Sequence, residues 1–136
     1  MIVVDASVWV STAVPSDAFE RMSSTWLARA VLAGEELAGP TLVLAEVAGA
    51  VSRKLGDVAR ADLAVRRLTA TPNLTLLPVD DDLAREAARL AADLGLRGAD
   101  ATYAAVARRL GCPLVTWDAE LIRKTRGTIA ARQPTS

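Results

Sequence analysis

Short apolar runs without polar alternation are separated along this chain by longer segments with helical spacing. The first run is Ile2–Val4, and further strands are expected at Leu37–Pro40, Leu74–Val79 and Pro113–Thr116. A strand that lacks polar alternation is typical of a parallel sheet, because helices bury both of its faces. We therefore expect an α/β fold with a central parallel sheet, and any ligand site at the carboxyl ends of the strands.

Helix start and stop signals fill the segments between these runs. A short helical region follows the first strand and is broken at Pro15 and Ser16. Thr41 is expected to cap the helix that follows it, and Gly56 to end that helix. The acidic triplet at 80–82 is interpreted as charge at a helix N-terminus rather than as a metal site. Longer helices are expected at Asp17–Ala33, Leu42–Leu55, Val58–Thr69, Leu83–Leu94 and Ala99–Leu110.

The length of the chain suits one domain. With 136 residues, half of them apolar, the chain can bury most of its surface in one core, so residues 1–136 are expected to form a single domain. No apolar run approaches the roughly 18 to 20 residues that span a bilayer, and Asp5 follows the first strand without a basic start. We expect a cytoplasmic protein with no membrane segment. The one cysteine, Cys112, is expected in the core rather than as a nucleophile.

Histidine is absent from the chain. Its absence removes the most common general base and the most common zinc ligand, and with them the serine–histidine and cysteine–histidine mechanisms. Any catalysis must therefore depend on carboxylates.

Charge is unevenly distributed, although the formal net charge is zero. Residues 1–94 hold nine bases and thirteen acids, whereas residues 95–136 hold seven bases and three acids. A basic last third around an acidic centre suits a phosphodiester, and a solvated basic surface is the alternative. Aromatic residues make up only 4% of the chain, so base stacking is not the obvious way for it to bind nucleic acid.

Two acids follow strands directly. Asp5 comes after the strand 2–4, and Asp118 comes after the strand 113–116 in a similar way. If these strands are neighbours, both carboxylates lie at the edge of the sheet where ligands bind. Helix N-capping is the structural alternative for Asp5.

Two further acids lie in apolar helices. Glu46 is the only ionisable residue between Thr41 and Ser52, on a helix that is apolar nearly all round and is expected to be buried. Burial of a carboxylate requires a cation or hydrogen bonds, and an exposed Glu46 on a narrow polar seam is the alternative. Asp100 begins a helix whose next charge is Arg108, and N-capping explains it equally well.

Together, Asp5, Glu46, Asp100 and Asp118 predict a metal site. Carboxylates held within a few ångströms repel one another, whereas Mg²⁺ and Mn²⁺ bind groups of oxygen ligands readily. Sites of this kind hydrolyse phosphodiesters, because the metal activates a water molecule and offsets charge on the leaving oxygen.

Four segments follow one another in a specific order and spacing and span nearly the whole chain: Ile2–Ser7, the apolar helix that carries Glu46, Gly98–Ala107 and Pro113–Asp118. Together they resemble the PIN domain family, and within it the VapC-type toxin ribonucleases.

The resemblance implies a three-layer α/β/α sandwich around a central parallel sheet. It also implies Mg²⁺- or Mn²⁺-dependent cleavage of RNA by the acidic quartet Asp5, Glu46, Asp100 and Asp118. Ser7 and Thr116 match hydroxyls of the family that accompany the first and last acids. Family members often carry another acid or amide near the fourth acid, where this chain has Glu120 and its role is open. A toxin of this type implies a homodimer and a cognate antitoxin protein.

Two other functions are considered. One is a non-catalytic PIN-like module that binds RNA or protein; retention of all four acids argues against it, because a scaffold has no reason to bury uncompensated charge. The other is a phosphatase of the haloacid dehalogenase type, which also uses a strand-end aspartate and Mg²⁺. That chemistry requires a second aspartate two residues on, where this chain has Ser7.

Overall fold

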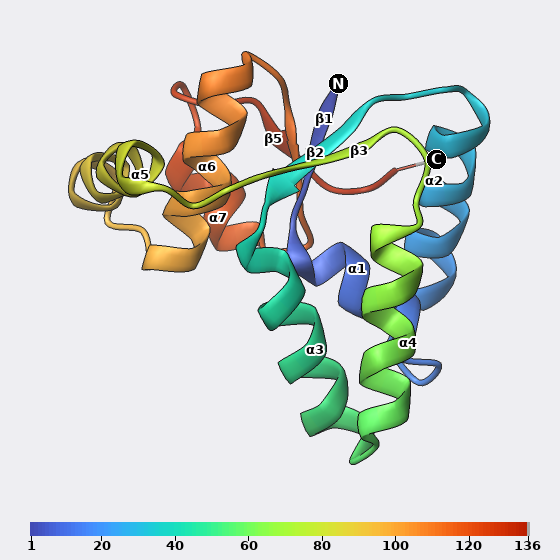
Figure 1. The fold of residues 1–136 in the computed structure, drawn as a ribbon. Helices are drawn as coiled ribbons and strands as arrows, with labels where there is room; N and C mark the ends of the chain where they lie inside the picture. The colour runs from blue at the N-terminus through green and yellow to red at the C-terminus, as the bar shows by residue number, and fades with distance from the viewer. Residues whose placement is uncertain (136) are drawn as a thin grey trace.

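A five-stranded parallel sheet lies at the centre of the computed structural model, which describes residues 1–135. Its strand order is β3-β2-β1-β4-β5, and helices cover it on both sides (Figure 1). The strands are β1 (Ile2–Val4), β2 (Leu37–Pro40), β3 (Leu74–Leu77), β4 (Leu114–Val115) and β5 (Ala131–Arg132). The helices are α1 (Ala6–Ala13), α2 (Glu20–Leu32), α3 (Leu42–Leu55), α4 (Val58–Thr69), α5 (Asp81–Leu94), α6 (Gly98–Leu110) and α7 (Ala119–Thr125). The expected α/β fold, with helices on both sides of a parallel sheet, is confirmed.

The central strand β1 is completely buried and pairs with β2 on one side and β4 on the other. Val3 stands opposite Ala38 and Leu114, and Val4 stands opposite Val115. The chain runs outward from β1 through β2 and β3, and then returns to the other side of β1 to form β4 and β5. The strand order therefore reverses between β1 and β4, and open α/β sheets bind ligands at the carboxyl ends of strands beside such a reversal.

The first long helix begins later than expected. α2 starts at Glu20 rather than at Asp17, because the Asp17 carboxylate accepts the backbone N–H of Phe19 at 2.8 Å and the Asp17 carbonyl accepts that of Glu20 at 3.1 Å. These local hydrogen bonds form a turn that competes with the helix. Strand β3 is also shorter than expected, since its pairing with β2 ends at Leu77, one residue before Pro78.

The acidic triplet starts α5, as predicted. The Asp80 carboxylate accepts the backbone N–H of Leu83 at 2.9 Å and caps the helix, and Asp81 and Asp82 lie in its exposed first turn. Thr41 does not cap α3 through its side chain; its hydroxyl accepts the backbone N–H of Val79 at 3.4 Å instead.

The expectation that α3 is largely buried is wrong. Helices α3 and α4 form an antiparallel pair that projects away from the sheet (Figure 1). Only one stripe of α3, formed by Val43, Val47 and Val51, is therefore fully buried. Glu46 is half-buried beside this stripe, between the two alternatives that its sequence suggested.

Within residues 1–135, no helix combines the length and the apolar character that a bilayer span requires.

Candidate active site

Asp5 lies at the carboxyl end of the central strand and is only 7% exposed. Its backbone N–H donates to the Val115 carbonyl at 2.9 Å, so β4 fixes its position. Its carboxylate accepts the backbone N–H of Ser7 at 3.3 Å and caps α1. The capping alternative is therefore correct for Asp5, and the residue also lies where the strand order reverses.

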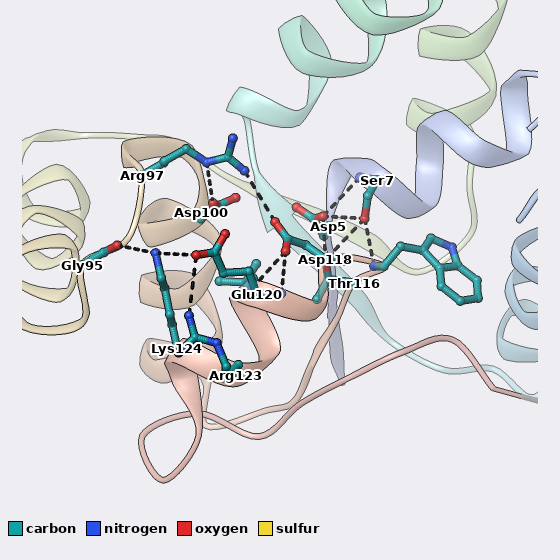
Figure 2. A network of polar contacts seen from close by, with 12 residues as sticks. Asp5, Ser7, Gly95, Arg97, Asp100, Thr116, Asp118, Glu120, Arg123 and Lys124 are labelled. Carbon is teal, nitrogen blue, oxygen red and sulfur yellow. Dashed lines mark hydrogen bonds and ion pairs between the residues drawn. The ribbon is translucent and has the colours of Figure 1, made fainter.

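Two hydroxyls orient the Asp5 carboxylate (Figure 2). Oδ2 accepts the Ser7 hydroxyl at 2.6 Å and the Thr116 hydroxyl at 2.8 Å. Ser7 Oγ in turn accepts the backbone N–H of Trp117 at 3.1 Å, and Thr116 Oγ1 accepts that of Asp118 at 3.0 Å. Strands β1 and β4 are thus joined by side chains at the edge where both carboxylates lie. The sequence singled out both hydroxyls through the resemblance.

Asp118 ends the segment after β4 and begins α7. Its Oδ1 accepts the backbone N–H groups of Glu120 at 2.8 Å and Leu121 at 3.1 Å, so it also caps a helix. Its second oxygen, Oδ2, is 3.5 Å from the Arg97 guanidinium. One oxygen of Asp118 is thus used by the fold, and the other faces the site.

Asp100 lies in the first turn of α6 and does not cap it, because Arg97 occupies the capping position. The Arg97 guanidinium donates to Asp100 at 3.2 Å and reaches Asp118, so it spans both carboxylates (Figure 2). Burial raises the pKa of the Asp100 carboxyl, Arg97 lowers it, and the charges of Asp5 and Asp118 raise it. The charges of the other two aspartates therefore act on the pKa of Asp100.

Glu46 reaches the same edge from α3. Its Oε1 accepts the hydroxyl of Tyr103 on α6 at 2.7 Å. Burial raises the pKa of the Glu46 carboxyl, the Tyr103 hydrogen bond lowers it, and the charges of Asp5 and Asp100 raise it. Burial also raises the pKa of the Tyr103 phenol, and the hydrogen bond to Glu46 raises it further. Tyr103 therefore stays protonated and acts as a donor.

The four predicted acids thus lie around one edge of the sheet and influence one another electrostatically. They are not collapsed onto one point: within residues 1–135, no three potential ligand side chains lie close enough to share a metal ion. Asp100 and Asp118 line a hollow of about 170 Å³, whereas Glu46 lines a neighbouring groove of about 420 Å³. Like charges repel, so such carboxylates spread apart unless a cation draws them together.

The donor set fits a hard divalent cation. All four side chains offer carboxylate oxygens, which are the ligands that Mg²⁺ and Mn²⁺ prefer. Arg97 already lies between Asp100 and Asp118 as a positive charge, which shows that this position favours a cation. The side chains present are therefore compatible with the predicted metal.

Glu120 lies beside Asp100 and Asp118 and is paired with two cations of its own helix, α7. Its carboxylate lies 3.1 Å from the Lys124 ammonium and 3.6 Å from the Arg123 guanidinium, and it lines the same hollow as Asp118 (Figure 2). Cys112 is half-buried against the core, and burial raises the pKa of its thiol, which favours the protonated and unreactive form.

Sequence reasoning missed two residues of the site. Arg97 was counted only as part of a basic region, and Tyr103 only as part of a motif. Tyr103 was detectable in principle, because a fully buried phenol on an apolar helix requires a hydrogen-bond partner. The partner itself lies on a different helix and has no local sequence signal.

Comparisons with known proteins agree on the fold. A PIN domain family model matches residues 2–127. VapC20 of Mycobacterium tuberculosis, a sarcin-ricin loop cleaving toxin, superposes with a TM-score of 0.74 and 22% identity, over 90% of this chain and 94% of that chain. PAE2754 of Pyrobaculum aerophilum gives a TM-score of 0.70 and 28% identity, over 96% of this chain and 81% of that chain.

A third similar structure is a complex. VapBC2 of Rickettsia felis, bound to a DNA fragment from its promoter, gives a TM-score of 0.74 and 16% identity, over 98% of each chain. A search of curated protein sequences gave no significant match.

Proposed function

This chain belongs to the PIN domain family, and we propose that it is a metal-dependent endoribonuclease, the toxin of a type II toxin–antitoxin pair. The observation that carries the proposal is the placement of Asp5 and Asp118 at the carboxyl ends of β1 and β4, where the strand order reverses. Family membership rules out the dehalogenase-type phosphatase. We treat residues 1–136 as one PIN-like domain.

In this proposal Asp5, Glu46, Asp100 and Asp118 would hold Mg²⁺ or Mn²⁺. When bound, the cation would make a water molecule more acidic and offset negative charge at the scissile phosphate. The chain itself positions the carboxylates: Ser7 and Thr116 fix Asp5, Tyr103 fixes Glu46, and the capping bonds of α7 fix Asp118.

RNA is proposed as the substrate because two cations adjoin the acids and could contact a phosphate. Arg97 and Lys124 line the hollow that holds Asp100 and Asp118. Arg108, by contrast, comes eight residues after Asp100 in α6, about 12 Å away along the helix axis. Arg108 therefore does not line this hollow, and we expect it to contribute less to RNA binding than Arg97 or Lys124.

Cleavage of RNA by the purified chain tests the proposal. Total RNA is incubated with the protein in Mg²⁺ or in EDTA, and the new RNA ends are sequenced. We expect specific ends that appear only with the metal. RNA that is bound but left intact in both conditions would favour the alternative, a non-catalytic PIN-like binding module.

Ser7→Ala is expected to slow cleavage by roughly 10- to 100-fold, the usual effect of removing a partner that orients a metal ligand. Ser7 is partly exposed and its hydroxyl is 2.6 Å from Asp5, so the fold should tolerate the change. Cleavage rates and thermal melts of Ser7→Ala and Ser7→Thr measure this effect. Thr retains a hydroxyl and should restore most of the rate, and equal rates for the two variants would contradict the orienting role.

Arg97→Gln is expected to lower the Mg²⁺ concentration needed for half-maximal thermal stabilisation. The Arg97 charge neutralises Asp100 and Asp118, and its removal leaves both carboxylates free for the cation. A titration of melting temperature with Mg²⁺ measures this directly, with Arg85→Gln on α5 as a matched control for loss of a surface ion pair. A higher Mg²⁺ requirement in Arg97→Gln would show that Arg97 supports the site instead.

The proposed partners are a second copy of the chain and a small antitoxin. Leu42, Ala45 and Ala48 of α3 lie outside the buried stripe and offer an apolar surface for a homodimer. The antitoxin would place a basic side chain on the hollow between Asp100 and Asp118, where the Arg97 guanidinium now lies. We expect a dimeric mass at micromolar concentration, and inhibition by the protein of an adjacent gene. A monomer that no neighbouring gene product inhibits would contradict the toxin assignment.

A further inference from the structure

A groove leads from the proposed active site toward α2. It has a volume of about 420 Å³, and two residues of the proposed site, Ser7 and Glu46, line it. Its other lining side chains include an aromatic pair, Phe19 and Trp117, and the cations Arg53 and Lys54 of α3. The groove thus combines an acidic end, an aromatic wall and a basic wall.

The aromatic wall is a stacked pair. The rings of Phe19 and Trp117 are nearly parallel, with centroids 4.0 Å apart and an interplanar angle of 10°. Phe19 is 39% exposed, so it combines contact with Trp117 and access to solvent. An exposed aromatic ring that is supported from behind is a suitable surface for a nucleic acid base.

Trp117 is held rigidly in this position. Its indole N–H donates to Ser23 Oγ at 2.7 Å, and the hydroxyls of Ser23 and Ser11, both buried, hydrogen-bond to each other at 2.6 Å. Its backbone N–H donates to Ser7, the residue that orients Asp5. The aromatic pair is therefore fixed relative to the proposed catalytic carboxylates.

The basic wall belongs to the same face of α3 as Glu46. Glu46, Ala50 and Arg53 follow one another at helical spacing, and the backbone position of Arg53 is seven residues after Glu46, about 10 Å along the axis. A Cβ at Gly49 would lie 3.0 Å from an Arg53 guanidinium nitrogen, so Arg53 folds back along α3 toward Glu46.

Arg53 is available to a ligand. In the described part of the chain, it forms no ion pair, whereas Lys54 lies 3.9 Å from Asp17, an acid that also lines the groove. A guanidinium that forms no ion pair within the described residues and folds back over Gly49 toward Glu46 is suited to contact a phosphate next to the one being cut.

We propose that this groove is the subsite for single-stranded RNA beside the scissile phosphodiester, with a base stacked on Phe19 and a neighbouring phosphate bound by Arg53. The inference rests on the proposed ribonuclease function and names the residues that position its substrate. Sequence-specific RNA recognition usually targets single strands, because their unstacked bases can stack on aromatic side chains. The low aromatic content of the chain suggested otherwise, but two of its five aromatic residues are concentrated here.

Binding of a short single-stranded RNA tests the stacking contact. The RNA carries a fluorescent purine analogue that is quenched on stacking, and all variants share an Asp5→Asn background that is expected not to cut it. We expect Phe19→Ala to weaken binding by roughly tenfold or more and to remove the quenching. Phe19→Leu should behave like Phe19→Ala, and Phe19→Tyr should bind like the parent. Leu32→Ala, an exposed residue at the other end of α2, is the control.

The same RNA tests the phosphate contact. Arg53→Ala should weaken binding and reduce the slope of log affinity against log salt by about 0.7, the value for one contact to a single strand. Arg29→Ala, which removes an exposed cation from the last turn of α2, should change neither quantity to the same extent. An unchanged salt slope in Arg53→Ala would overturn the assignment of Arg53.

The outcomes separate this inference from the proposed function. Metal-dependent cleavage with unaltered RNA binding in Phe19→Ala would overturn the subsite and leave the ribonuclease standing. Loss of binding in Phe19→Ala but not in Phe19→Leu would also overturn it. Any apolar side chain would then be sufficient for binding, and stacking of a base on an aromatic ring would not be required. Quenching that depends on Phe19, in a protein whose parent cuts no RNA, would support base stacking in the groove and reject the nuclease.

Discussion

Asp5→Asn is expected to lower the rate of RNA cleavage by well over a hundredfold and to leave the fold intact. Removal of a group that merely orients a metal ligand costs up to about a hundredfold, so removal of a ligand charge should cost more. The amide keeps the shape of the side chain and is an equally good N-cap, so α1 should still begin at the same place. Rates with Mg²⁺ and thermal melts of the same preparations measure both parts of the prediction.

Asp57→Asn is the matched control for this change. Asp57 also caps a helix, since its carboxylate accepts the backbone N–H of Arg60 at 3.2 Å, but it starts α4 rather than contributing to the acidic site. Asp118→Asn should behave like Asp5→Asn, because Asp118 likewise combines a cap with a place in the site. Normal cleavage by the Asp5 and Asp118 variants would refute the proposed function.

Addition of Mg²⁺ at neutral pH is expected to raise the melting temperature by on the order of 10 °C at about 100 times the dissociation constant.

Without the metal, the same protein should lose stability as the pH rises. Burial raises the pKa of both Glu46 and Asp100 in the folded state. The folded chain then binds these protons more tightly than the unfolded chain does. The stability that Glu46 and Asp100 contribute in this way is fully present below the ordinary carboxyl pKa of about 4. It disappears as the pH rises through their raised pKa values in the folded state.

Melting curves from pH 4 to pH 8, in EDTA and in Mg²⁺, test this prediction. Glu46→Gln and Asp100→Asn should each flatten the pH dependence in EDTA and reduce the gain from Mg²⁺. Asp62→Asn, an exposed acid on α4, is the control for a general loss of negative charge. A gain from Mg²⁺ that is equal in all of these variants would place the cation elsewhere on the protein.

The parallel sheet and the strand-end acids were predictable because both follow from local patterns. Buried strands have no polar alternation, and a parallel arrangement brings the carboxyl ends of β1 and β4 to the same edge. Asp5 and Asp118 could therefore be located from residues next to them in the sequence. Strand β5 and helix α7 were not predicted, since two and seven residues are too short to show a periodicity.

Features that depend on contacts between distant segments could not be read from the sequence. The apolar pattern of α3 indicates that its surface requires a cover, but the pattern does not distinguish a cover within the chain from one supplied by a partner. The hydrogen bond between Glu46 and Tyr103 and the stacking of Phe19 on Trp117 join different elements of the fold. Neither pair has a spacing that a sequence pattern could reveal.

Asp5 and Asp118 each cap a helix and also belong to the proposed site, and this affects which mutations are expected to inactivate the protein. A single-base transition converts an aspartate codon into an asparagine codon, and asparagine keeps both helix caps. Under selection against a harmful nuclease, the most accessible mutations would therefore leave folded and inactive proteins rather than unstable ones. If the chain is the proposed toxin, such alleles would persist as folded proteins that lack one of the carboxylates offered to the antitoxin.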